Sequence, residues 1–131
     1  MIGLDTNVIV RYLTQDDRVQ AAKATYIVEH VLTEDNAGFV SVVAMVETVW
    51  VLERAYGFGG KAIASAIEAL LAIDVLVIQS EQEIFAAMIA LKANRGSFAD
   101  ALIGALGAAG GCAKTLTFDR KASRMAAFAP A

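Results

Sequence analysis

The chain alternates between short apolar runs of strand length and longer stretches with helical periodicity. Strands separated by helices favour a parallel sheet that is covered by helices on both faces. No linker, repeat or low-complexity segment suggests a second domain, so we expect one domain over residues 1–131. We predict an α/β fold with three layers, α/β/α, around a central parallel sheet of four to five strands. The expected strands lie at residues 1–4, 37–41, 75–78 and 113–118.

The stretches between these runs carry helix signals. Residues 16–35 predict one long amphipathic helix, because apolar side chains recur there at helical spacing. Gly57 predicts the end of a second helix, over residues 42–57. Ser80 and Glu83 have capping-box spacing, which predicts that Ser80 caps the following helix. The apolar positions of the long helix are Val19, Ala22, Tyr26, Ile27 and Val31; the other expected helices lie at residues 7–13, 42–57, 59–73, 81–93 and 99–109.

The composition excludes a disordered chain. Hydrophobic residues make up 57% and charged residues 19%, and the mean hydropathy is +0.55. This is more apolar surface than a lone monomer of this size tolerates, so we expect a partner or a homodimer. The small-residue helix at 99–109 allows close backbone approach, either in a dimer or inside the chain. Its small side chains include Gly104, Ala105, Ala108 and Ala109.

Neither a membrane span nor a signal peptide is visible in the sequence. The most apolar window contains Glu47 and is shorter than the roughly 18 unbroken apolar residues that a spanning helix needs. Asp5 and Arg11 interrupt the N-terminal apolar run. We therefore expect a cytoplasmic protein. Its single cysteine, Cys112, is expected to be a small buried packing residue, and His30 a surface or packing residue without a catalytic role.

Four acidic residues stand at corresponding places in the predicted sheet. Ligands of open parallel sheets bind beyond the carboxyl ends of the strands. Asp5 follows the first expected strand, and Asp119 follows the last. Asp100 begins the helix that precedes the last strand, and Glu47 lies inside the helix that follows the second. We expect all four at one edge of the sheet.

Each acid also has a structural explanation. Asp is a preferred N-cap residue, and Asp5, Asp100 and Asp119 each stand where a helix can begin. Glu47 lies inside its helix and cannot cap it. A buried unpaired carboxylate costs several kcal/mol, so Glu47 should be exposed, paired with Arg54 or bound to a cation.

Four carboxylates at one edge would repel one another. Two unit charges about 5 Å apart cost roughly 3 kcal/mol at an effective dielectric near 20. This arrangement favours a bound divalent cation. Oxygen ligands alone suit Mg²⁺, with Mn²⁺ as the alternative, because no His or Cys cluster offers softer donors. Mg²⁺ held by carboxylates is typical of phosphoryl chemistry, so these residues are candidates for a catalytic metal site.

These segments resemble a known family. GLDTNVIVRYL near the N-terminus, the lone Glu47 in a helix, SFADALI and TLTFD are similar to the motifs of PIN-domain ribonucleases, and among them the VapC toxins of toxin–antitoxin pairs. The resemblance extends from residue 1 to about residue 124. It implies a metal-dependent endoribonuclease in which Asp5, Glu47, Asp100 and Asp119 form the acidic quartet.

The resemblance also implies neighbours and partners for this site. Thr6, Asn7 and Thr117 would line it and orient carboxylates or metal-bound water; turn formation and capping explain these three residues equally well. A VapB-type antitoxin and a homodimer are the implied partners, with DNA contacted only through the antitoxin. Many members carry another acid soon after the fourth, whereas Arg120 and Lys121 follow Asp119 here, which puts a second metal site in doubt. The closing strand is also poorly visible in residues 125–131.

The charge balance is compatible with RNA. The net charge is −3, but without the four proposed ligands ten acids face eleven bases. Phosphate contacts would come from local cations, for which a solvated helix face is the simpler explanation. The candidates are Arg11, Arg95, Arg120, Lys121 and Arg124.

Two other functions remain open at this point. A receiver domain also gathers acids beyond a parallel sheet, but it needs an acidic pair after the first strand and a Lys after the last. Here one acid follows the first strand and another acid follows the last. A catalytically silent RNA-binding or scaffold module of the same fold is the second alternative, and metal-dependent RNA cleavage would distinguish the enzyme from both.

Overall fold

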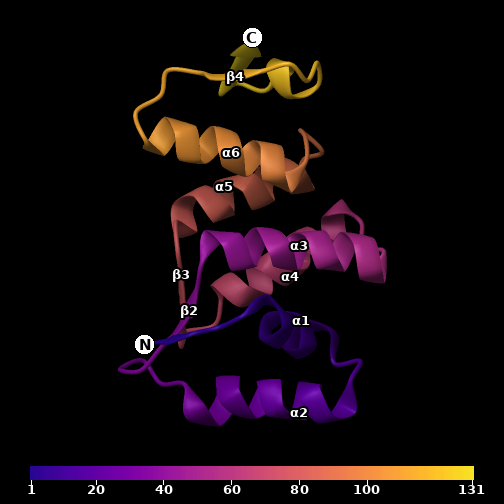
Figure 1. The fold of residues 1–131 in the computed structure, drawn as a ribbon, viewed down its shortest axis with the longest axis vertical. Coiled ribbons are helices and arrows are strands. Elements are labelled where there is room, and N and C mark those ends of the chain that lie inside the picture. Colours follow the sequence, from indigo (N-terminus) through magenta and orange to yellow (C-terminus); the bar gives the residue numbers. More distant parts are fainter. The chain divides into compact units, whose positions relative to one another are not determined.

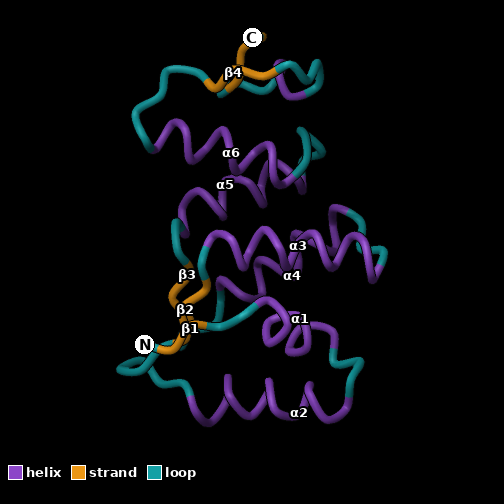
Figure 2. The backbone as a smooth tube through the Cα atoms, viewed as in Figure 1, coloured by secondary structure: helices purple, strands orange, loops and turns teal.

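The computed structural model describes all residues 1–131, which form two compact units. We call Met1–Gln79 the N-terminal unit and Ser80–Ala131 the C-terminal unit, and describe each by itself. Both combine helices with parallel strands (Figures 1 and 2), which confirms the predicted α/β class. The strands number five and are divided between a three-stranded and a two-stranded sheet. The single domain stays a prediction.

The N-terminal unit holds the three-stranded sheet. Its order is β1-β2-β3 and both pairings are parallel, with Gly38 opposite Ile2 on one side and Leu76 on the other. Parallel neighbours require long crossover connections, which the helices of this unit supply. The strands are β1 (Ile2–Gly3), β2 (Gly38–Val40) and β3 (Leu76–Ile78); the helices are α1 (Thr6–Thr14), α2 (Arg18–Tyr26), α3 (Val42–Tyr56) and α4 (Gly60–Leu71).

The helix predicted over residues 16–35 has a different form and a different buried face. Asp17 caps α2 by accepting the backbone N–H of Gln20 at 3.0 Å, and the α-helix ends at Tyr26. A π-helical turn, η1 (Ile27–Val31), follows, in which Leu32 N donates to Ile27 O. The predicted apolar stripe is wrong, because Val19 and Tyr26 are exposed. The buried residues are Ala21, Ala24, Val28 and Leu32.

Small side chains form the packing face of α2. α2 packs against α1, and the alanines at 21 and 24 are each only 3% exposed. Alanine on the packing face of α2 lets two helix backbones approach closely. Two apolar stripes share this segment, and periodicity alone did not distinguish the one that is buried.

The third helix begins and ends as its sequence indicates. Ser41 caps α3 by accepting the backbone N–H of Ala44 at 3.1 Å. Gly57 ends it with φ 67°, a left-handed conformation that glycine adopts without steric cost, so the predicted helix end is confirmed. Met45 and Leu52 on its inner face belong to the core of the unit. No helix of the structure is long and apolar enough to cross a membrane.

The C-terminal unit is a helical pair with a two-stranded parallel sheet. α5 (Glu81–Lys92) packs against α6 (Phe98–Ala109), and β4 (Thr115–Thr117) pairs with β5 (Phe128–Pro130). A 3₁₀ turn, η2 (Ala122–Arg124), lies between the strands. The predicted cap by Ser80 is wrong: its backbone is left-handed, with φ 54°, whereas a capping residue is extended, and its side chain makes no capping bond.

The closing strand, poorly visible in the sequence, is β5. Its backbone pairs with β4, and Phe128 is buried while Pro130 lies exposed at the end. Proline is tolerated at such an end because little of the ladder depends on its missing N–H. Three residues with one large apolar side chain give too short a pattern to predict.

Part of the small-residue helix is explained by packing inside this unit. A Cβ on Gly104 would stand 2.8 Å from the Phe128 ring, and one on Gly107 would stand 2.7 Å from Thr115 Oγ1. These glycines let α6 lie against the β4–β5 sheet. Of the two readings of this helix, the internal one applies to Gly104.

Candidate metal site and RNA-contacting residues

Asp5 lies between β1 and α1, and one of its two carboxylate oxygens is engaged in a hydrogen bond. It is the N-cap of α1, where Asp5 Oδ1 accepts the backbone N–H of Thr6 at 2.8 Å. The capping reading is thus confirmed. The residue is exposed, and its second carboxylate oxygen has no hydrogen bond within the protein. One oxygen remains for a cation.

Glu47 lies on the exposed face of α3. It shares that face with Val43, Trp50 and Arg54. Of the alternatives for this carboxylate, the pairing with Arg54 is absent, and the Arg54 guanidinium lies over the Trp50 ring at 5.2 Å from its centroid. The one ion pair of the chain joins other residues. Exposure therefore accounts for this carboxylate, and both oxygens are free to bind a cation.

Asp100 lies in the first turn of α6, three positions after the N-cap residue. Ser97 is the N-cap, and its Oγ accepts the backbone N–H of Asp100 at 3.1 Å. The capping explanation of Asp100 is therefore wrong. Its half-buried carboxylate accepts no hydrogen bond, and it benefits from the positive end of the helix dipole.

Asp119 follows β4 and forms hydrogen bonds with residues before and after it in the chain. Its backbone N–H donates to Thr117 Oγ1 at 3.0 Å, and Asp119 Oδ1 accepts the backbone N–H of Ala122 at 2.9 Å. The second contact holds the turn that leads into η2. Like Asp5, Asp119 keeps one carboxylate oxygen free and is exposed.

The four acids are divided equally between the two units. Asp5 and Glu47 belong to the N-terminal unit, and Asp100 and Asp119 to the C-terminal unit. No group of three or more His, Cys, Asp or Glu residues in the structure could hold a metal ion. The four-carboxylate site therefore stays a prediction.

The polar residues predicted beside the site differ in their surroundings. Thr6 is buried at the start of α1, and Asn7 beside it is exposed. Thr117 contacts Asp119 directly, through the hydrogen bond described above. Only Thr117 thus contacts one of the four acids through its side chain in this structure.

Among the cations predicted to contact RNA, Arg11 forms hydrogen bonds and an ion pair within the protein, and the others form no ion pair. Arg11 bonds to the Asp16 carboxylate at 3.2 Å, to Tyr56 Oη at 2.8 Å and to Gln20 Oε1 at 2.8 Å. Because these contacts occupy its guanidinium, Arg11 is a poorer candidate for binding RNA phosphates than the other cations. The exposed cations without an ion pair are Arg95, Arg120, Lys121 and Arg124.

Comparison with sequence models of known families identifies the family of this protein. The sequence model of the PIN domain matches residues 2–128. The chain belongs to the PIN domain family. PIN domains are generally metal-dependent nucleases, and the match spans both units and all four acids. No curated protein matches the chain at a significant level.

The donors of this PIN domain suit a hard divalent cation by their chemistry. All four candidates are carboxylates, and each keeps at least one free oxygen in the structure. Softer donors lie elsewhere. His30 is exposed on η1 with its ring centroid 5.2 Å from that of Tyr26, and Cys112 is exposed and free, which corrects its predicted burial.

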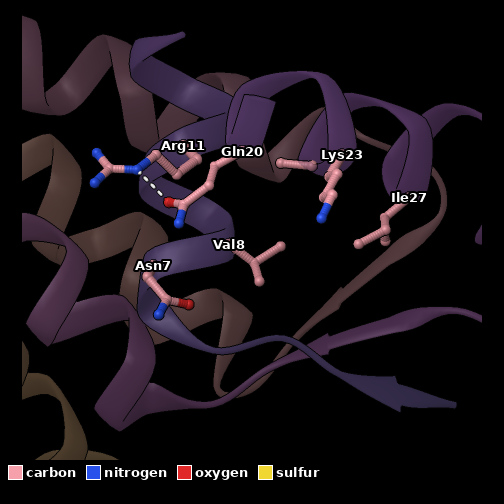
Figure 3. A pocket seen from close by; sticks show the side chains of 7 residues that line it. Asn7, Val8, Arg11, Gln20, Lys23 and Ile27 are labelled. Carbon is pink, nitrogen blue, oxygen red and sulfur yellow. Dashed lines mark hydrogen bonds between the residues drawn. The ribbon is translucent and has the colours of Figure 1, made fainter. Parts of the chain in front are cut away.

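Sequence reasoning missed a pocket in the N-terminal unit of the PIN domain. It measures about 250 Å³ and lies between α1 and α2 (Figure 3). Figure 3 shows the Arg11 guanidinium bonded to Gln20, with Val8 between Asn7 and Lys23. No pattern in the sequence indicated this pocket. The lining residues are Asn7, Val8, Arg11, Gln20, Lys23, Ala24 and Ile27.

Proposed function

We propose that this PIN domain is a Mg²⁺-dependent endoribonuclease that hydrolyses RNA phosphodiester bonds, and that it is the toxin of a type II toxin–antitoxin pair of VapBC type. The observation that carries the nuclease is the family match over residues 2–128, which includes Asp5 and Asp119 after strands β1 and β4 and two further acids, Glu47 in α3 and Asp100 in α6. The toxin assignment rests on the resemblance of GLDTNVIVRYL, SFADALI and TLTFD to VapC motifs.

The proposed metal ligands are Asp5, Glu47, Asp100 and Asp119. Asp100 and Glu47 offer whole carboxylates, since nothing in the protein bonds to them. Asp5 and Asp119 offer one oxygen each, because the other oxygen accepts a backbone N–H from Thr6 and Ala122 respectively. Mg²⁺ is the proposed ion and Mn²⁺ the alternative, because both accept all-oxygen ligands.

The protein's part in hydrolysis follows from these contacts. A bound Mg²⁺ would supply an oriented water and stabilise charge on phosphate oxygens. Thr117 fixes the backbone at Asp119, and the N-terminal turn of α1 fixes Asp5, so these carboxylates need little reorganisation. Hydrolysis that leaves the 2′-hydroxyl uninvolved gives 5′-phosphate and 3′-hydroxyl ends.

Substrate and partners belong to the same proposal. Arg95, Arg120, Lys121 and Arg124 are the proposed phosphate contacts, because they are exposed and unpaired. A VapB-type antitoxin would inhibit the nuclease by inserting an Arg among the carboxylates, and would cover apolar surface with a further segment. A homodimer is proposed because many large apolar side chains are exposed.

One observation favours a second candidate, a catalytically silent RNA-binding or scaffold module. Neither unit contains three potential metal ligands close together. A chain that never gathers its carboxylates would bind RNA through its cations without cleaving it.

Cleavage of a labelled single-stranded RNA by the purified chain separates these candidates. We expect cleavage with Mg²⁺, none with a chelator, and none with Asp100→Asn. Asp35→Asn is the matched control, since it makes the same change at an exposed turn residue and should cleave normally. Chelator-resistant cleavage would overturn the metal mechanism. RNA binding without cleavage under any condition would establish the silent module.

A further inference from the structure

Phe118 is the most exposed large hydrophobic residue of the chain. It is 94% exposed and stands at the bend directly after β4, between Thr117 and Asp119. A phenylalanine in water forfeits roughly 1.5–3 kcal/mol that burial would supply. An aromatic side chain in this position is therefore available to a ligand with an apolar face.

Three cations without an ion pair follow Phe118 in the sequence. Arg120 and Lys121 follow within three residues, and Arg124 ends the η2 turn; all three are exposed and none forms an ion pair. Lys114, on the other side of β4, differs because it donates to the Ala126 carbonyl. We call Phe118, Arg120, Lys121 and Arg124 the β4 loop patch.

The backbone that carries the patch is fixed. Asp119 bonds to Thr117 before it and to Ala122 after it, at 3.0 and 2.9 Å. Ala122 is 2% exposed and anchors the turn, while Ser123 Oγ donates to the Arg120 carbonyl at 2.7 Å. A ring and cations held on a fixed turn lose little backbone entropy when a ligand binds.

We propose that Phe118 stacks on an unpaired base of single-stranded RNA while Arg120, Lys121 and Arg124 contact the neighbouring phosphates. Aromatic rings beside cationic side chains are the combination that binds single strands, because bases offer π faces and the backbone offers negative charge. A paired base keeps its faces covered by the stack, so the patch selects unpaired segments. This inference rests on the proposed ribonuclease function and adds the residue that holds the base.

The place of Phe118 beside Asp119 links this binding to the proposed chemistry. Ligands of parallel α/β sheets bind beyond the carboxyl ends of strands, where both residues stand. The neighbouring Cα atoms are about 3.8 Å apart, so a base stacked on the ring keeps its own phosphates near the Asp119 segment. Stacking would therefore hold the strand in position as well as add affinity.

RNA affinity measured without cleavage tests the ring. Fluorescence anisotropy of a labelled single-stranded oligonucleotide is recorded with the full chain in chelator. Loss of one stacked base weakens binding about 5- to 150-fold, so Phe118→Ala should do the same. Phe85→Ala is the matched control, because Phe85 is also an exposed phenylalanine, at 52%, but lies one turn from acidic Glu81. Its affinity should change less than twofold.

A spectroscopic variant reports stacking directly. The single tryptophan is removed by Trp50→Phe, and Phe118→Trp then places the only indole in the patch. Single-stranded RNA should quench its fluorescence at saturation while affinity is retained. A fully paired duplex of the same sequence should quench it far less, because its bases are already stacked.

The cations are tested by salt dependence. Each lost phosphate contact to a single strand lowers the slope of log affinity against log salt by roughly 0.7. Arg120→Ala and Lys121→Ala should each show this change, whereas Phe118→Ala should leave the slope unchanged and lower the affinity at every salt concentration.

The outcomes separate this inference from the proposed function. Unchanged RNA affinity in Phe118→Ala, with a normal circular dichroism spectrum, overturns the stacking role even if the parent cleaves RNA. Weakened RNA binding in Phe118→Ala with no cleavage by the parent supports the stacking role and overturns the nuclease. Unchanged RNA affinity together with a loss of self-association would show that the ring makes a protein contact, which also overturns the inference.

Discussion

Ser97 Oγ accepts the backbone N–H of Asp100 at 3.1 Å, so the serine caps α6 and the aspartate carboxylate stays free. The two residues lie three positions apart. The sequence alone allowed both helix capping and metal binding for Asp100, whereas in the structure Ser97 does the capping. Stability at this helix start depends on Ser97, and metal binding is proposed for Asp100.

The Ser97–Asp100 pair predicts different effects for two substitutions. Ser97→Ala should lower the free energy of unfolding by about 1 kcal/mol, because a helix donor loses its acceptor. Asp100→Asn should abolish cleavage, because the amide lacks the charge proposed to hold the cation, and it should lower the free energy of unfolding by no more than the roughly 0.3–1 kcal/mol that a charge gains from the helix dipole. Denaturant unfolding and RNA cleavage measure the two effects. An active Asp100→Asn protein would contradict the proposed ligand role.

Substitutions of Asp5 should affect both capping of α1 and the proposed metal binding. Asp5→Asn keeps an oxygen that accepts from Thr6, so stability should change little while cleavage is lost. Asp5→Ala removes the cap as well and should lower the free energy of unfolding by a further ~1 kcal/mol. Thermal unfolding of the two variants in chelator provides the comparison. Equal melting temperatures would show that the capping bond contributes nothing measurable.

The Asp16 carboxyl should titrate below its usual range. Hydrogen bonds from Tyr56 and then Thr14, with the charge of Arg11, lower the pKa of Asp16. Its stabilising contribution is therefore fully present above the unfolded pKa of about 3.9 and is lost as the pH falls through the lower folded value. Carboxyl chemical shifts measured against pH should show a low pKa for Asp16, and Tyr56→Phe should raise that pKa. An unshifted Asp16 in the parent would contradict the contact.

Self-association should be visible in solution. Large apolar side chains remain exposed on several elements, with Val43 and Val19 at 73% and 67%. Such surface favours a homodimer, because burial of apolar area stabilises association. Light scattering at tens of micromolar should give the mass of two chains. A monomer at that concentration would count against the dimer.

Inhibition by the antitoxin should depend on Mg²⁺. An Arg inserted among carboxylates competes with the ion, so raising Mg²⁺ should weaken inhibition. Replacing that Arg by Ala should restore cleavage while the complex still forms through its apolar segment. Equal inhibition by both antitoxins at every Mg²⁺ concentration would indicate that it blocks RNA access instead.

Helix ends were more predictable from local sequence than helix faces. Gly57 ended α3 as expected, because a left-handed backbone suits glycine whatever surrounds it. Ser80 failed as a cap since its own backbone is left-handed, which its spacing from Glu83 did not reveal. The buried face of α2 was predicted wrongly because the segment has apolar residues on two faces. The face with Ala21 and Ala24 is the buried one, and α2 packs against α1.

The sequence by itself determined the alternation of helices and parallel strands, the PIN family and the positions of the four acids, because periodicity and motif spacing are local properties of the chain. Only the tertiary structure decided how those acids are engaged. One oxygen of Asp5 caps α1 and one oxygen of Asp119 bonds to the backbone N–H of Ala122. Ser97, and not Asp100, caps α6, and Glu47 is exposed while Arg54 lies over Trp50. Hydrogen bonds and exposure depend on backbone geometry and on side chains brought from elsewhere in the chain, which spacing along the sequence does not specify.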